Sequence, residues 1–139
     1  MKKLIGHLLS LIVGGFFVWA GIVKLTGPTE FFQSILHYQL VGEDAAWWTA
    51  MFLPWLEVFA GIGLIIPQTR SGALAWLTLL LLVFEASLVS ALARGLNIDC
   101  GCLGGSGSSV TFALARNGFL LAALVGIYFI SICPRKKIL

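Results

Sequence analysis

Two cysteines separated by a single glycine are the residues of this chain best suited to covalent chemistry. Cys100, Gly101 and Cys102 follow Asp99 in a short polar segment between two long apolar runs. An extended Cys-x-Cys unit places its Cα atoms near the upper end of the separation that a disulfide tolerates, about 4.4–6.8 Å. Gly101 gives the backbone the freedom to close that gap, and a strained, accessible disulfide is a reactive one. The spacing therefore predicts a redox-active dithiol–disulfide pair.

Two other uses of these thiols stay open at this point. They could be inert residues of a loop, or they could bind a soft metal together with His37. A fourth ligand for closed tetrahedral zinc is missing, so no metal site is predicted. Cys133 is expected at the opposite membrane surface, and no role is assigned to it.

Four apolar runs must position the cysteine segment. The chain has 139 residues, of which 59% are hydrophobic and only 11% are charged, a composition that a soluble domain could not hide from water. Crossing a bilayer core of about 30 Å takes roughly 20 helical residues. The runs of this length are Leu4–Val23, Trp47–Ile66, Gly72–Ala93 and Phe112–Ile132.

These runs predict an all-α integral membrane protein with one domain, residues 1–139, built as a four-transmembrane-helix bundle. Lipid offers no partner for the unpaired backbone groups of an open sheet, which excludes strands. The first run begins after Lys2 and Lys3 and resembles a secretory signal. It is longer than a usual signal core and no clean cleavage site follows it, so a retained helix is expected. The net charge of +3 comes from residues at the ends of the runs, which does not indicate nucleic-acid binding.

A short amphipathic surface helix is predicted between the first two spans. After the breaker Thr26-Gly27-Pro28, residues Thr29–Leu40 place apolar side chains at helical spacing, and Gly42 ends the pattern. The alternative is an ordered loop with scattered aromatic residues.

The last run carries a stripe of small residues, Gly118, Ala122 and Gly126. Small residues allow close helix contact in membranes. We expect this contact within the bundle, with dimerisation as the alternative. Pro54 is expected to kink the second span or to leave a carbonyl for a neighbour to satisfy.

The basic residues predict the orientation of the bundle. Six fall on one side of the predicted spans and three on or near the other: Lys2, Lys3, Arg70, Arg135, Lys136 and Lys137 against Lys24, Arg94 and Arg116. The positive-inside rule then places both termini in the cytoplasm. The Cys-Gly-Cys segment faces the periplasm or its equivalent, the compartment in which disulfides persist.

Several charged residues lie within the predicted spans. Helical geometry puts Glu57 about 15 Å deep, Glu85 about 12 Å deep and Arg116 roughly 6 Å deep. A carboxylate in hydrocarbon costs at least about 2.5–3.5 kcal/mol, so these groups should face the interior and pair. The expected pairs are Arg116 with Glu85, and Lys24 with either acid. Together they would line a pocket below the cysteines that relays protons or binds a polar head group. The alternative is a structural ion pair that fixes helix register.

The charges that flank the cysteines in sequence act in opposite directions. Arg94 or Arg116 near a thiol would favour the reactive thiolate. Asp99 would oppose this effect, and could instead take protons during exchange.

Three motifs resemble the methylamine utilisation protein MauE family within the wider DoxX-like membrane proteins. They are Ala20-Gly21-Ile22-Val23-Lys24-Leu25 with Pro28, Leu53-Pro54 with Leu56-Glu57 and Ala60-Gly61, and Asp99-Cys100-Gly101-Cys102-Leu103-Gly104. Arg116-Asn117 fits as well. The match spans nearly the whole chain, and the Cys-Gly-Cys element is its most specific part. Leu103 stands where the family commonly has Phe.

This resemblance implies a bacterial inner-membrane protein concerned with periplasmic disulfide chemistry, acting beside a thioredoxin-like partner. Such proteins are associated with maturation of disulfide-rich methylamine dehydrogenase, and the wider group includes subunits linked to quinone chemistry. The leading hypothesis is a thiol–disulfide oxidoreductase that uses Cys100 and Cys102, with a quinone held between helices near Lys24, Glu57, Glu85 and Arg116. The rival hypotheses are a non-enzymatic scaffold for a maturing periplasmic protein and a thiol-based handler of metals or small solutes.

Overall fold

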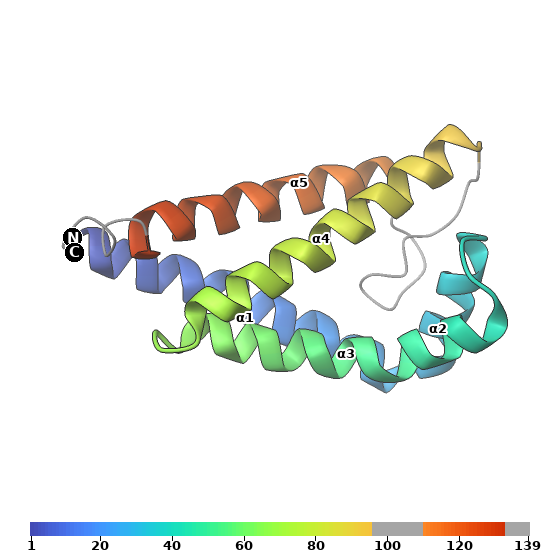
Figure 1. The fold of residues 1–139 in the computed structure, drawn as a ribbon, viewed down its shortest axis with the longest axis horizontal. Coiled ribbons are helices and arrows are strands. Elements are labelled where there is room, and N and C mark those ends of the chain that lie inside the picture. The colour runs from blue at the N-terminus through green and yellow to red at the C-terminus, as the bar shows by residue number, and fades with distance from the viewer. Residues whose placement is uncertain (96–109, 133–139) are drawn as a thin grey trace.

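Long helices dominate the computed structural model, which describes residues 1–95 and 110–132. Over these residues it contains helices and turns and no strand (Figure 1). Four segments are long and apolar enough to cross a membrane, which confirms the all-α integral membrane fold. The elements in chain order are α1 (Lys2–Thr26), α2 (Pro28–His37), α3 (Glu43–Ile65), α4 (Arg70–Ala93), α5 (Val110–Ile127) and the π-helical turn η1 (Tyr128–Ile132).

Local sequence explains where these helices begin and end. Pro28 starts α2 because its fixed φ suits the first helical position. α3 begins at Glu43, before the predicted Trp47, because Glu43 and Asp44 are favourable at the positive end of the helix dipole. It ends at Ile65, next to the restricted backbone that precedes Pro67. The predicted surface helix is confirmed as α2, which ends at His37 rather than at Leu40 and buries the side chain of Phe31.

Glycines bring α1 and α3 into the closest contact of the bundle. A Cβ on Gly14 would lie 2.6 Å from the carbonyl oxygen of Gly61, and a Cβ on Gly61 would lie 2.7 Å from the oxygen of Gly14. About two turns further along α1, a Cβ on Gly21 would lie 2.8 Å from the carbonyl oxygen of Pro54. Such backbone approach is how helices associate in lipid, which supplies no hydrophobic drive between them.

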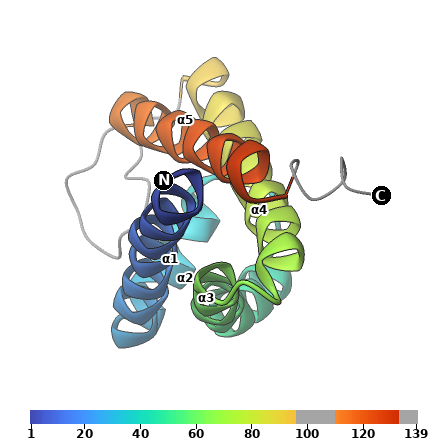
Figure 2. The ribbon, with the colours of Figure 1, turned by 90° about the vertical axis from the view of Figure 1, so that its left-hand side faces the viewer.

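The remaining helices complete a ring. Figure 2, which looks along the bundle, shows α3 between α1 and α4, with α5 on the far side from α3. α5 packs inward through the buried side chains of Ala113, Leu120, Leu124 and Ile127.

The small-residue stripe of α5 does not make the contact that we expected within the bundle. Gly118 and Ala122 are exposed, and a Cβ on Gly118 would meet nothing within 4 Å. Gly126 comes nearest to a neighbour, because its Cβ would lie 3.8 Å from Leu9 Cδ2. The expectation was wrong because lipid-facing and bundle-facing surfaces of a membrane helix are both apolar, so small size alone does not identify the inner one.

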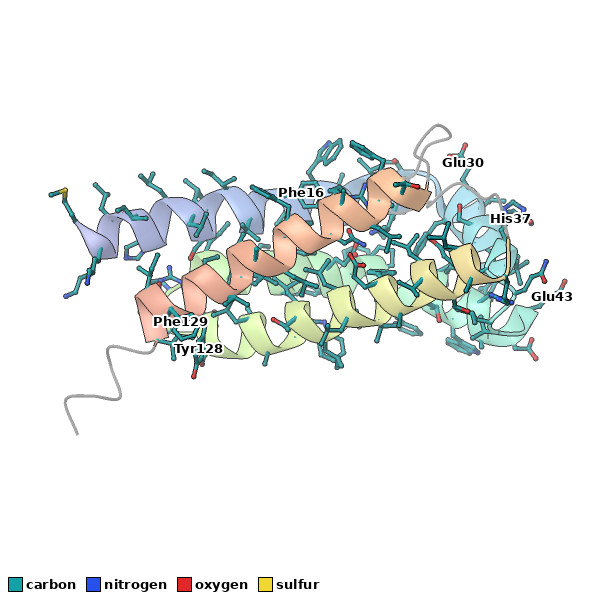
Figure 3. All side chains as sticks on the ribbon, turned by 90° about the horizontal axis from the view of Figure 1, so that it is seen from above. Phe16, Glu30, His37, Glu43, Tyr128 and Phe129 are labelled. Carbon is teal, nitrogen blue, oxygen red and sulfur yellow. The ribbon has the colours of Figure 1, made fainter. Side chains whose placement is uncertain are left out.

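The two ends of the bundle differ. α1 and η1 meet at the terminal end, where a Cβ on Gly6 would lie 2.7 Å from Ser131 Oγ. Figure 3 shows Tyr128 and Phe129 at this end, and Glu30, His37 and Glu43 at the other. We call the latter the α2 end.

Arg70 connects α3 and α1 at the terminal end. Its side chain is buried, and Nε and Nη2 donate to the carbonyl oxygens of Leu64 and Ile65 at 3.0 and 3.3 Å. Nη2 also lies 3.2 Å from His7 Nδ1. The last carbonyls of a helix have no partner within it, so Arg70 caps α3 and ties it to α1.

Candidate functional site

The predicted redox residues lie outside the part of the chain that the structure describes. They are Asp99, Cys100 and Cys102, and Cys133 lies outside it as well. The redox pair therefore stays a prediction. The supporting residues Lys24, Glu57, Glu85 and Arg116 are all described.

Lys24 and Glu57 form an ion pair inside the bundle. Lys24 Nζ lies 2.6 Å from Glu57 Oε2 and 2.8 Å from Oε1, and the side chains are each 2% exposed. Lys24 is near the end of α1, but its Cα–Cβ bond tilts toward the helix N-terminus, which lets the ammonium reach back into the bundle. This confirms the prediction that Lys24 pairs with an acid, and identifies that acid as Glu57.

Two aromatic rings enclose the ammonium. Lys24 Nζ lies 5.4 Å from the centroid of Phe31, on α2, and 5.6 Å from that of Phe84, on α4. Both distances are within the range of cation–π attraction, which is strongest where water is excluded. Phe31 is the one residue of α2 that is fully buried. The surface helix thus covers the ion pair from the α2 end.

Arg116 and Asn117 face the same region from α5. Asn117 is 3% exposed, and its Oδ1 accepts from Nε and Nη2 of Arg116, both at 3.4 Å. Because a guanidinium offers only donors, Asn117 must turn its oxygen toward Arg116 and its amide nitrogen away. That nitrogen, Nδ2, is buried and has no hydrogen-bond partner among the described residues.

Glu85 is not part of this pair. It lies on the inward side of α4, between the buried Leu81 and Leu88, and its side chain is partly buried. It makes no ion pair with any described residue, and its Oε1 accepts no hydrogen bond from them. The expected pairing of Glu85 with Arg116 is therefore not seen in this part of the chain.

A small cavity lies beside the ion pair. Its volume is about 20 Å³, and it is lined by residues from four helices, including Ala20, Lys24, Glu57, Phe84, Arg116 and Asn117. One water needs about 10–15 Å³, whereas small-molecule sites typically measure about 300–1,000 Å³. The quinone stays a prediction.

Polar contacts close the α2 end over the site. Arg94 donates to the carbonyl oxygens of Tyr38 and, at 3.4 Å, Gln39 in the turn after α2. The Tyr38 ring packs against Leu88 and Ala113. Burial raises the pKa of the Tyr38 phenol to about 12, against the opposing charge of Arg116. Tyr38 therefore stays neutral at physiological pH.

Sequence reasoning assigned no role to three residues of the site. Asn117 was named only in the family match. The rule that selected Glu57 for its cost in lipid applies to a buried amide as well. Phe31 and Phe84 carry no such signal, because aromatic residues are common in both lipid-facing and buried positions.

One protein family matches the chain over nearly its whole length. The family model described as "Methylamine utilisation protein MauE" matches residues 2–130. The curated protein of that name from Methylorubrum extorquens is 33% identical over 111 residues, which are 78% of this chain and 60% of the relative. Its counterpart from Paracoccus versutus is 33% identical over 128 residues, 90% of this chain and 69% of the relative.

A third relative, from Paracoccus denitrificans, is 30% identical over 118 residues, 84% of this chain and 63% of the relative. The chain thus spans between 60% and 69% of the length of these three proteins. No solved structure matches it.

Proposed function

The chain belongs to the methylamine utilisation protein MauE family, and from this premise we propose that it is a membrane dithiol–disulfide exchange protein for extracytoplasmic thiol proteins. Cys100 and Cys102 form the exchanging pair, and the client is a thioredoxin-like or other cysteine-containing protein. The observation that carries this proposal is the placement of the buried ion pair. Lys24 lies in the last turn of α1, where it pairs with Glu57 and lies against Phe31 of α2. This is the end of the bundle at which α4 stops and α5 starts (Figure 1).

The exchange needs no electron carrier besides the two proteins. A thiolate of the reduced protein attacks one sulfur of the partner's disulfide, which forms a mixed disulfide and releases the other sulfur as a thiolate. The second thiolate of the attacking protein then resolves the mixed disulfide. Two electrons pass from the dithiol to the disulfide, and the protons of the two thiols pass to the thiolates released or to water.

The distribution of basic residues supports an orientation in which the α2 end lies outside the cytoplasm. Lys2, Lys3 and Arg70 lie at the terminal end. By the positive-inside rule the terminal end faces the cytoplasm of a bacterial inner membrane, and the cysteine segment faces the periplasm. That compartment permits disulfides.

Thiol trapping in cells tests the proposal. A Cys133→Ser background leaves only Cys100 and Cys102 to react. We expect their redox state to change with the oxidant supply, and either single Cys→Ser variant to trap a mixed disulfide with a partner. A pair that never changes state, together with partner oxidation that survives replacement of both cysteines, would refute exchange and leave a scaffold role.

Orientation has its own measurement. In the same background, a membrane-impermeant maleimide applied to intact spheroplasts should label the reduced pair. Labelling only after the membrane is opened would place the cysteines on the cytoplasmic side and end the proposal.

A further inference from the structure

The cavity beside the ion pair contains the elements of a binding site for a very small ligand. Asn117 is 3% exposed, its Nδ2 carries two hydrogens, and that atom has no partner among the described residues. Leaving a buried amide donor unsatisfied destabilises the folded protein, because the group has lost its bonds to water. Its oxygen is already occupied by Arg116, so rotating the amide would not remove this cost.

The ion pair offers the complementary acceptor. Each carboxylate oxygen of Glu57 accepts one hydrogen bond from Lys24, at 2.8 and 2.6 Å. A carboxylate oxygen has room for two such bonds, so each keeps one acceptor position. Lys24 and Glu57 line the cavity together with Asn117.

We propose that this cavity binds one water molecule, which accepts a hydrogen bond from Asn117 Nδ2 and donates one to the Glu57 carboxylate. The volume of about 20 Å³ admits one water and little more. Buried waters make two to four hydrogen bonds, and Asn117 Nδ2 and the Glu57 carboxylate supply two partners here. This water joins α5 to the α1–α3 pair through polar contacts. Binding of this water does not require disulfide exchange by the cysteines.

Solid-state NMR in lipid bilayers tests it on the intact protein. The sequence has two asparagines, Asn97 and Asn117, so side-chain 15N-asparagine labelling with Asn97→Gln leaves one signal. We expect magnetisation to pass from water to the Asn117 amide at short mixing times. Absence of transfer in an otherwise folded protein overturns the proposal.

A cavity-filling variant separates a bound water from bulk access. Ala20 is buried and lines the cavity, so Ala20→Val should displace the water and abolish the transfer while the Asn117 signal remains. Ala115→Val, at an exposed position of α5, is the matched control and should retain it. Transfer that persists unchanged in Ala20→Val overturns the proposal.

A small anion is the competing occupant. Crystals grown from lipidic phase in sodium bromide should show an ordinary water peak between Asn117 and Glu57 and no anomalous signal. A bromide peak at this position would assign the site to an anion and refute the water.

Discussion

Gly14 and Gly61 face each other so closely that a side chain on either would collide with the backbone of the other. A Cβ on Gly14 would lie 2.6 Å from the carbonyl oxygen of Gly61, and a Cβ on Gly61 would lie 2.7 Å from the carbonyl oxygen of Gly14. A backbone oxygen cannot swing aside as a flexible side chain can, so the helices themselves must separate to accept a methyl group. This contact sets the distance between α1 and α3, and with it the reach from Lys24 to Glu57.

We therefore predict that Gly14→Ala destabilises the protein by about 1–3 kcal/mol, the range for overpacking a tight contact. The matched control is Gly118→Ala on α5, where a Cβ meets nothing within 4 Å. That change should be neutral or stabilise by up to about 1 kcal/mol through helix propensity. Unfolding in lipid-mimetic micelles measures both, and equal effects would contradict the prediction.

Removing one member of the buried ion pair should destabilise the protein far more than removing both. Lys24→Met leaves Glu57 as an uncompensated buried charge, a change that costs about 3–5 kcal/mol in buried pairs. The double variant Lys24→Met/Glu57→Leu should recover most of this loss, because no charge remains to be desolvated. Lys3→Met, at an exposed lysine, is the control. A double-mutant cycle on the free energy of unfolding gives the coupling, and additive effects would show that the pair is not coupled.

Arg70 is predicted to stabilise the terminal end. Arg70→Met removes two charge-assisted bonds to the carbonyls of Leu64 and Ile65, each of a kind worth about 1.5–3 kcal/mol. We expect faster amide hydrogen exchange in the last turn of α3 and in the first turns of α4. Lys2→Met, an exposed cation at the same end, should leave the exchange unchanged. Protection that is unaffected in Arg70→Met would show that other groups cap α3.

Tyr38 gives the stability of the protein an alkaline limit. Its pKa of about 12 is above the ordinary value of 10.0, so the folded protein holds the phenolic proton more tightly than the unfolded chain. The stabilisation is complete below pH 10 and is lost as the pH rises toward 12. Tyr38→Phe should flatten the fall in stability across this window.

The same titration can be followed directly. The chain has two tyrosines, so Tyr128→Phe leaves Tyr38 as the only phenol. Its ultraviolet absorbance should report ionisation with a midpoint of about 12. A midpoint near the ordinary value of 10.0 would mean that Tyr38 is hydrated in the membrane-bound protein.

Much of the fold could be predicted because membrane insertion leaves strong marks in a sequence. Long apolar runs predicted the four spans, and the cost of charge in lipid selected Lys24 and Glu57 as interior groups. The amphipathic pattern after Pro28 correctly indicated α2.

The pairing of helices could not be predicted in the same way. Gly14 and Gly61 form the close contact while Gly118 is exposed, although all three are small residues in apolar runs. The choice of Glu57 over Glu85 likewise depends on how α1 crosses α3, which hydropathy does not encode. The water-sized cavity depends on the packing of four helices, so only the folded chain shows it.

The glycine contacts divide the bundle into parts of unequal stiffness. α1 and α3 pack backbone against backbone at Gly14 and Gly61, and a Cβ on Gly21 would lie 2.8 Å from the carbonyl oxygen of Pro54. The glycines of α5 make no comparable contact, so that helix is held by side chains alone. Lateral tension in the membrane should therefore displace α5 first, while α1 and α3 move as one rigid body carrying the Lys24–Glu57 pair.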